Sequence, residues 1–283
     1  MKYRSLSALT TDGKSVLQQG PLALVLIEDQ IEVDSTVAHL RKIGFGTIIA
    51  FCAADIALPD GVIRVDHDVL ADDALEDILN AVIAVAPDQW IHYCYNAEYF
   101  YYPFVETRSV GEMIAFCMEE RRNSVLTYVV DLYARDLGAF PDAVDPQTPY
   151  LDRAGYYALA RRDETGAELD RQMDYYGGLR WRFEEHIPDH RRRIDRLSLF
   201  RAAPGLRMDH DRRFNIAEYN TYACPWHNSL TATICSFRTA KALRRNPGSK
   251  HQIDSFDWPN AVAFNWQSQQ LLDLGLMEPG QWF

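Results

Sequence analysis

The chain has 283 residues, of which 47% are hydrophobic, and it carries a formal net charge of −11. This length and apolar content suffice for one extended domain or for two small ones. The acidic balance disfavours a general nucleic-acid-binding protein, because such proteins present a basic surface to phosphate.

The cysteine pattern and the first twenty residues indicate in which cellular compartment the protein is expected. The five cysteines are scattered without a C-x-x-C pair, a pattern typical of buried thiols in a reducing environment rather than of a disulfide framework. The first twenty residues lack the apolar stretch of a signal peptide, and no run approaches the ~20 apolar residues of a membrane span. The sequence therefore predicts a cytoplasmic protein without a transmembrane segment or a nucleic-acid partner.

Strands and helices are predicted to alternate over the first hundred residues. Continuous apolar runs at 21–27, 47–52, 61–66 and 90–94 are typical of buried parallel strands. Segments 34–44 and 72–87 have the apolar spacing and the end signals of helices, the first with Asp34 or Ser35 as its cap and Gly44 as its stop. The alternation predicts an α/β fold with a mostly parallel sheet flanked by helices. No G-x-G-x-x-G or P-loop is present, so a standard dinucleotide or P-loop site is disfavoured.

The second half is predicted to be less regular. A helix at 109–122 and a strand at 124–134 precede a long loop rich in Pro, Gly and Asp. Further strands are predicted at 156–161, 178–185 and 195–202, and helices at 229–248 and 261–277. We expect a single domain over residues 1–283, with halves of about 20–135 and 150–283, and an apolar C-terminus that docks on it.

The stretch "YNAEYFYYP" at 95–103 follows one of the predicted strands. Ligands of such sheets bind beyond the carboxyl ends of the strands. The stretch resembles the acidic strand-end motif of GT-A-fold glycosyltransferases of the family 2 type, which in one bacterial branch commonly reads Asp-x-Asp-Glu-Phe, then apolar residues, then Pro. In this comparison Tyr95 and Ala97 stand where the two aspartates would be, and the matching positions are Glu98, Tyr99 and Pro103.

The likeness continues in order over about residues 22–230. Segment 27–51 resembles the family's opening strand, helix and "GF-x-x-I" strand, and "VVDLYA" resembles a "DMYP"-like strand end. Later, "GGLRWRF" resembles a "GGPR-x-R" turn, "IDRLSLFRA" an "LNKIPLVRW"-like segment, and "CPWHNSL" a "TH-x-L" turn.

The resemblance implies a GT-A-like fold that transfers a hexosyl group from a nucleotide-sugar to a glycan, lipid or protein hydroxyl. It also implies a divalent cation, Mn²⁺ or Mg²⁺, that neutralises charge on the leaving diphosphate. In this chain Glu98 and the late histidine, His227, would hold the metal, with His92 as an alternative, and Tyr95 and Asn96 would lie at the substrate.

The missing aspartates leave three interpretations open. Arginines replace the metal, other acids bind it, or transferase activity has been lost. Glu98 can equally be an ordinary loop carboxylate beside a packed wall of tyrosines, and a histidine such as His227 is more often structural.

The stretch 174–193 is also rich in charged, aromatic and glycine residues that could form a site. The pair Gly177 and Gly178 permits close approach of the backbone to a ligand. Arg180 and Arg182, two apart on the predicted strand, would share a face and bind diphosphate oxygens through their planar forks. An edge strand with a solvated charged face is the plainer interpretation, and 191–193 is more typical of an acid-paired surface.

A general base is needed for transfer to a hydroxyl. Glu184 and Glu185 are candidates, and the strand-end acid Asp131 is a third catalytic candidate that would contact the acceptor or sugar, or simply pair with an arginine. Two functions thus remain: a glycosyltransferase with a degenerate metal motif, and a non-catalytic GT-A-fold binding or scaffold protein.

Overall fold

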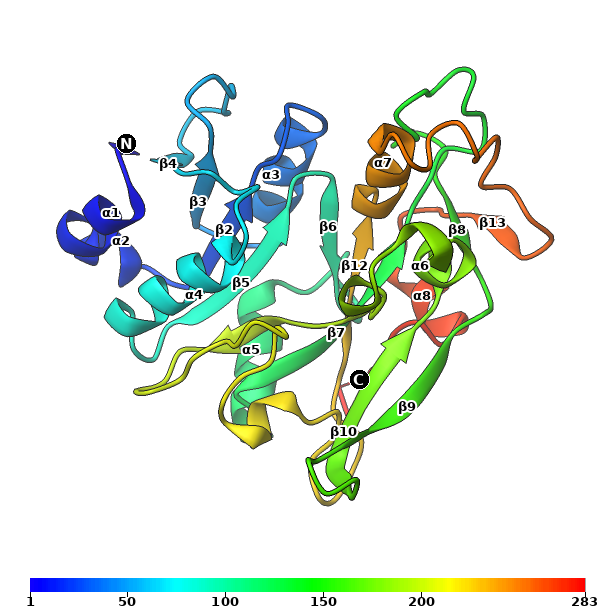
Figure 1. The fold of residues 1–283 in the computed structure, drawn as a ribbon. Coiled ribbons are helices and arrows are strands. Elements are labelled where there is room, and N and C mark those ends of the chain that lie inside the picture. Colours follow the sequence, from blue (N-terminus) through cyan, green and yellow to red (C-terminus); the bar gives the residue numbers. More distant parts are fainter. Residues whose placement is uncertain (283) are drawn as a thin grey trace. The chain divides into compact units, whose positions relative to one another are not determined.

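The computed structural model describes residues 1–282 and has an α/β fold (Figure 1). The largest sheet has nine strands in the described chain and is mostly parallel, which confirms the predicted α/β class; the GT-A-like form of it stays a prediction. The chain divides into two compact units, each built from separate stretches of sequence. Unit 1 comprises Met1–Phe100, Thr107–Leu126 and Leu197–Asn220; unit 2 comprises Tyr101–Glu106, Thr127–Arg196 and the chain from Thr221 onward.

Unit 1 contains the alternating strands and helices of the first half. Its elements are β1 (Lys2–Tyr3), α1 (Leu6–Asp12), α2 (Lys14–Leu17), β2 (Leu22–Leu26), α3 (Val33–Lys42), β3 (Thr47–Cys52), β4 (Ile63–Asp66), α4 (Ala74–Val85), β5 (Trp90–Tyr95), most of β6 (Glu98–Tyr101), α5 (Val110–Glu119), the start of β7 (Ser124–Asp131), most of β11 (Asp195–Arg201) and a 3₁₀ helix (Ala217–Asn220).

The strands of unit 1 run in the order β1-β4-β3-β2-β5-β11, with β11 antiparallel to β5 and the other pairs parallel. Every residue of β2, β3 and β5 is buried, as their continuous apolar runs predicted. Helix α3 begins at Val33 with Glu32, in a left-handed conformation, as its N-cap residue, so the predicted cap at Asp34 or Ser35 is wrong.

Unit 2 contains the rest of β7 and the less regular second half. Its elements are β8 (Tyr150–Asp152), β9 (Tyr157–Arg162), β10 (Glu168–Tyr176), α6 (Gly178–Arg182), two 3₁₀ helices (Glu184–His186 and Asp189–Arg191), β12 (Ala232–Ser236), α7 (Arg238–Arg245), β13 (Ala261–Ala263) and α8 (Ser268–Asp273). β12 pairs in parallel with β7, β9 with β10 form an antiparallel hairpin, and β13 pairs with β8.

Three predictions for unit 2 are wrong. Segment 178–185 is helical, because Gly177 and Gly178 both have positive φ and turn the chain out of β10 into α6. Segment 229–248 opens with the buried strand β12 before α7 begins, and 261–277 opens with β13 before α8. In both, a short strand leads into the helix, and hydrophobic periodicity does not separate the two.

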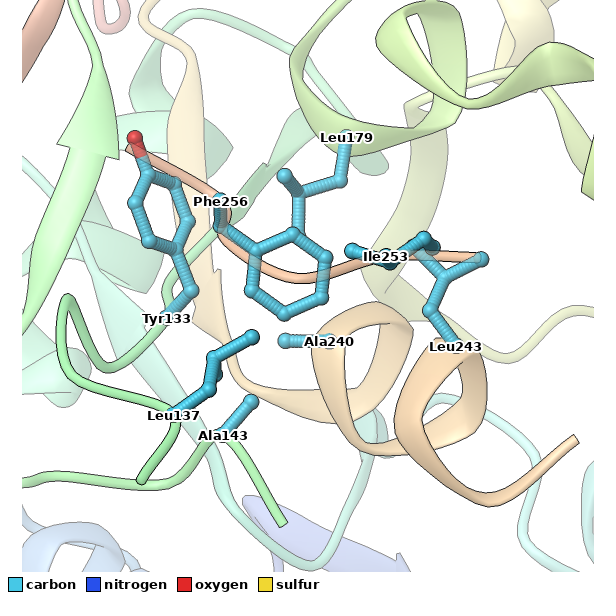
Figure 2. Close-up of a cluster of buried hydrophobic side chains, with 8 residues drawn as sticks. All are labelled: Tyr133, Leu137, Ala143, Leu179, Ala240, Leu243, Ile253 and Phe256. Carbon is cyan, nitrogen blue, oxygen red and sulfur yellow. The ribbon is translucent and has the colours of Figure 1, made fainter. Parts of the chain in front are cut away.

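Unit 2 has an apolar core beside α6 and α7. Figure 2 shows the ring of Phe256 among the side chains of this core, with Tyr133 at its edge. The hydroxyl of Tyr133 points away from the apolar side chains, and it donates a hydrogen bond to Asp152 Oδ1 at 2.6 Å. The full set of buried residues is Tyr133, Leu137, Ala143, Leu179, Ala240, Leu243, Ile253 and Phe256.

The end of the described chain packs on unit 2. Trp282 is buried, and its ring centroid lies 6.3 Å from that of Tyr102 and 6.1 Å from that of Phe104. The predicted docking of the C-terminus is confirmed at Trp282, while Phe283 lies outside the described residues. Across residues 1–282, none of the helices has the length and apolarity that a bilayer crossing requires.

Candidate functional site

The sheet of unit 1 reverses its order at β2. The chain passes from β2 to β3 and β4 on one side, then returns to β5 on the other, so β2 and β5 are neighbours. Leu26 pairs with Tyr95, so the carboxyl ends of both strands lie together. Such a reversal is where open α/β sheets bind ligands.

Asn96 joins the two segments that leave this reversal. Its Oδ1 accepts a hydrogen bond from the backbone N–H of Glu28 at 2.9 Å. Its Nδ2 donates to Asp29 Oδ1 at 2.7 Å and to the carbonyl of Ile31 at 2.9 Å. The side chain is completely buried. The amide therefore ties the loop after β2 to the end of β5.

Glu98 also serves the turn that contains it. Its Oε2 accepts a hydrogen bond from the backbone N–H of Tyr95 at 2.9 Å, across a turn in which Ala97 has φ +61°. Both Glu98 and Tyr95 are buried. The acid predicted as a metal ligand is thus engaged in closing the turn between β5 and β6.

The aromatic neighbours of this turn are also held by hydrogen bonds. The hydroxyl of Tyr99 lies 2.8 Å from Ser35 Oγ and donates to Glu32 Oε2 at 3.1 Å. Burial is the main reason that the pKa of Tyr99 is raised above its ordinary value. His39 Nε2 lies 2.8 Å from the carbonyl of Phe100, and burial lowers the pKa of this histidine to about 4.

In unit 2 the strand-end acid Asp131 lies beside the double-glycine turn. Its carboxylate Oδ1 is 3.6 Å from Arg180 Nε, and its side chain is completely buried. Neither oxygen has a hydrogen bond of normal geometry within the described residues, although Thr239 and the Arg180 backbone lie close enough to favour the charged form. Burial outweighs these contacts and Arg180, and it raises the pKa of Asp131.

The two glycines of the turn are required by what surrounds them. A Cβ at Gly177, where φ is +155°, would lie 2.2 Å from Tyr156 Cδ1. A Cβ at Gly178, where φ is +61°, would lie 3.0 Å from Asp131 Oδ2. Both glycines thus have positive φ, and Tyr156 and Asp131 occupy the space that a side chain would need; close approach of this backbone to a ligand stays a prediction.

A second buried carboxylate, Asp152 at the end of β8, holds Arg182. Arg182 Nη1 donates to Asp152 Oδ1 at 3.1 Å, and Trp258 Nε1 donates to the same oxygen at 2.6 Å. Burial raises the pKa of Asp152, and the hydrogen bond from Tyr133 and the charge of Arg182 offset part of that rise. Sequence reasoning missed Asp152, since "PYLDRAG" lies in a stretch assigned to a surface loop.

The remaining basic and acidic candidates of 184–193 are paired or exposed. Glu184 and Glu185 are both more than half exposed, and Glu184 Oε2 lies 3.7 Å from Arg192 Nη1. Arg193 Nη1 lies 3.1 Å from Asp174 Oδ1. The acid-paired interpretation of 191–193 therefore holds for Arg192 and Arg193.

His227 lies in a turn with Cys224, whose Sγ is 3.2 Å from His227 Nδ1. The residue is followed by a strand, β12, and not by the helix that the sequence predicted. The two proposed metal ligands belong to different units, Glu98 to unit 1 and His227 to unit 2. Within residues 1–282, no three His, Cys, Asp or Glu side chains are grouped so that they could hold a metal ion.

No protein-family model matches the chain, and no curated protein matches it.

Proposed function

We propose that the chain is a GT-A-like glycosyltransferase that uses a nucleotide-sugar donor, with Asp131 as its general base. The observation that carries the proposal is the state of Asp131: a buried carboxylate at a strand end, beside two glycines, whose oxygens have no hydrogen bond of normal geometry in the described chain. A carboxylate with a raised pKa is suited to accept the proton of an acceptor hydroxyl at neutral pH.

The other parts support the same function. The reversal of strand order at β2 and β5 is the arrangement that nucleotide-binding α/β sheets use. Arg180 lies two residues after the double-glycine turn, and an arginine fork suits diphosphate oxygens. The predicted shared face with Arg182 is wrong, because two residues of a helix that are two apart do not face the same way, and Arg182 is held by Asp152. Arg180 would balance charge on the diphosphate without a metal, so Mn²⁺ or Mg²⁺ becomes an aid rather than a requirement. The acceptor hydroxyl belongs to a glycan, lipid or protein.

One observation favours the alternative, a non-catalytic protein with the same fold. Asn96 and Glu98, which stand in the acidic motif, are engaged in hydrogen bonds that hold the fold. A protein that only binds a ligand or a partner needs no metal at this position.

Thermal unfolding against UDP, GDP, CMP and their sugars, each with and without Mn²⁺, is the first test. A ligand at ~100 times its Kd should stabilise the fold by roughly 2.7 kcal/mol. We expect stabilisation by one nucleotide-sugar without Mn²⁺, and weaker stabilisation in R180M. Stabilisation that requires Mn²⁺ would contradict the arginine-based site, and no stabilisation by any donor would contradict the transferase.

Turnover separates the two candidates. Release of nucleotide from the stabilising donor, in the presence of acceptor mixtures, should be lost in D131N while donor binding is kept. Binding without turnover in the wild-type protein would favour the non-catalytic alternative.

A further inference from the structure

Unit 2 exposes an aromatic ring before the double-glycine turn, Tyr157, and another after it along the chain, Trp181. In the described part of this unit, four large hydrophobic side chains are well exposed. Three of them, Tyr157, Leu159 and Trp181, belong to the continuous segment from β9 to α6. Tyr176, which directly precedes the turn, stacks on Tyr157 with ring centroids 5.2 Å apart and an interplanar angle of 16°.

Trp181 is exposed yet firmly backed. Its indole is 40% exposed, and a Cβ placed on Gly155 would lie 2.9 Å from its Cζ3. The same Cβ would lie 3.6 Å from Trp258 Cη2, so both indoles pack on the bare backbone of Gly155. Any side chain at Gly155 would occupy the position of the Trp181 ring, so the ring packs directly against the Gly155 backbone and Trp258.

The support is itself held by the buried polar cluster. Trp258 donates to Asp152 at 2.6 Å, and the guanidinium carbon of Arg182 lies 4.8 Å from the centroid of the Trp258 ring. Ordering Trp181 on binding a ligand would thus cost little conformational entropy, because its backing is already in place.

The chemistry of the segment selects the kind of ligand. An aromatic face carries partial negative charge and packs well against the weakly positive C–H face of a sugar ring. The exposed acids Glu184 and Glu185 follow Trp181 by three and four residues, and carboxylates accept hydrogen bonds from hydroxyls while they repel anions. One leucine and three rings are too little apolar surface for a stable protein interface or for insertion into a lipid layer.

We propose that Trp181, with the stacked pair Tyr157 and Tyr176, forms the acceptor subsite, and that the acceptor is an uncharged glycan. Its role as an acceptor rests on the proposed transferase function, whereas binding of the glycan does not.

The test is calorimetric titration of the full chain, without donor, with four neutral oligosaccharides: cellohexaose, maltohexaose, mannohexaose and chitohexaose. We expect at least one to bind, and W181A to bind it at least about fivefold more weakly, since the stacked ring contact is lost. W181Y keeps an aromatic face and should retain most of the affinity. W226A is the matched control, because the Trp226 indole is 88% exposed and lies outside the segment.

Thermal unfolding of each variant checks that it is folded. No binding of any of the four sugars, or equal affinity of W181A, W226A and wild type, would overturn the inference. If W181A does not fold, W181Y and Y157S carry the comparison, and unchanged affinity in both would overturn it. Glycan binding that depends on Trp181, together with no effect of any nucleotide-sugar, would refute the proposed transferase and leave the glycan subsite standing.

Discussion

Replacing Asn96 by alanine tests whether the acidic-motif region holds the fold or a ligand. The change removes one hydrogen bond from the Glu28 N–H, one to the Ile31 carbonyl and one to the carboxylate of Asp29. Ordinary hydrogen bonds contribute about 1 kcal/mol each and one to a charged group about 1.5–3 kcal/mol. The sum predicts that N96A lowers the free energy of unfolding by about 3–5 kcal/mol.

Urea unfolding followed by far-UV circular dichroism measures this change. N96D sharpens the test, since its carboxylate would face Asp29 Oδ1 and the Ile31 carbonyl without a proton to donate. We expect N96D at neutral pH to be destabilised at least as much as N96A, and to recover partly on mild acidification. N228A is the control, because Asn228 is exposed, and its effect should stay within about 0.5 kcal/mol. A loss below about 1 kcal/mol in N96A, combined with lost donor binding, would refute the reasoning and make Asn96 a ligand-binding group.

Three further predictions concern stability. Burial lowers the pKa of His39 to about 4, so below about pH 6.5 the unfolded state binds more protons than the folded state and the free energy of unfolding falls with pH. Between pH 7 and pH 5 the wild type should lose about 2 kcal/mol more of this free energy than H39Q, and an equal loss in both, measured by urea unfolding, would contradict the prediction. G177A should lower the free energy of unfolding by about 2–5 kcal/mol, because backbone strain at positive φ adds to the clash with Tyr156. G166A, where φ is also positive but no atom lies within 4 Å of the added Cβ, should lower it by only about 1–2 kcal/mol, and equal effects in thermal unfolding would refute the clash. R161M should cost about 3–5 kcal/mol, since Arg161 is buried between Asp174 and Asp195 at 2.7 Å from each, while the exposed R162M should be near neutral in the same urea assay.

The regular part of the fold was predictable because its signals are local. Each buried strand of unit 1 is a continuous apolar run, and α4 carries acids in its first turn, Glu76 and Asp77. The helix–strand boundaries of unit 2 were not predictable, since a single residue, Phe237, separates β12 from α7 and no Gly or Pro marks the change. Periodicity cannot separate a buried strand from the helix that it enters.

Candidate residues could be chosen from the sequence by type, but their partners could not. The spacing of Arg180 and Arg182 predicts a shared strand face that helix α6 does not provide, and Asp152, which holds Arg182, is thirty residues away in a short strand. Asn96 and Glu98 were identified as site residues, yet their partners at Glu28, Asp29 and Tyr95 depend on how strand ends meet. These hydrogen bonds depend on the tertiary structure and cannot be predicted from the composition or the local sequence pattern.

The energetics of the two buried carboxylates bear on the choice between a transferase and a binding protein. The pKa values of Asp131 and Asp152 are both raised, with burial as the largest cause, so the arginines do not fully offset the cost of burying these charges. A raised pKa in the folded state means that the free energy of unfolding falls as pH increases above the ordinary carboxyl pKa of about 3.8, because the folded state then binds more protons. At neutral pH the two buried carboxylates, Asp131 and Asp152, therefore lower the free energy of unfolding. Residues that reduce stability often serve a function. A scaffold protein would be more stable with apolar residues in place of these two buried carboxylates. Asp152 carries the same cost while it holds Arg182 and Trp258, so the proposed base role of Asp131 is decided by turnover in D131N and not by its burial.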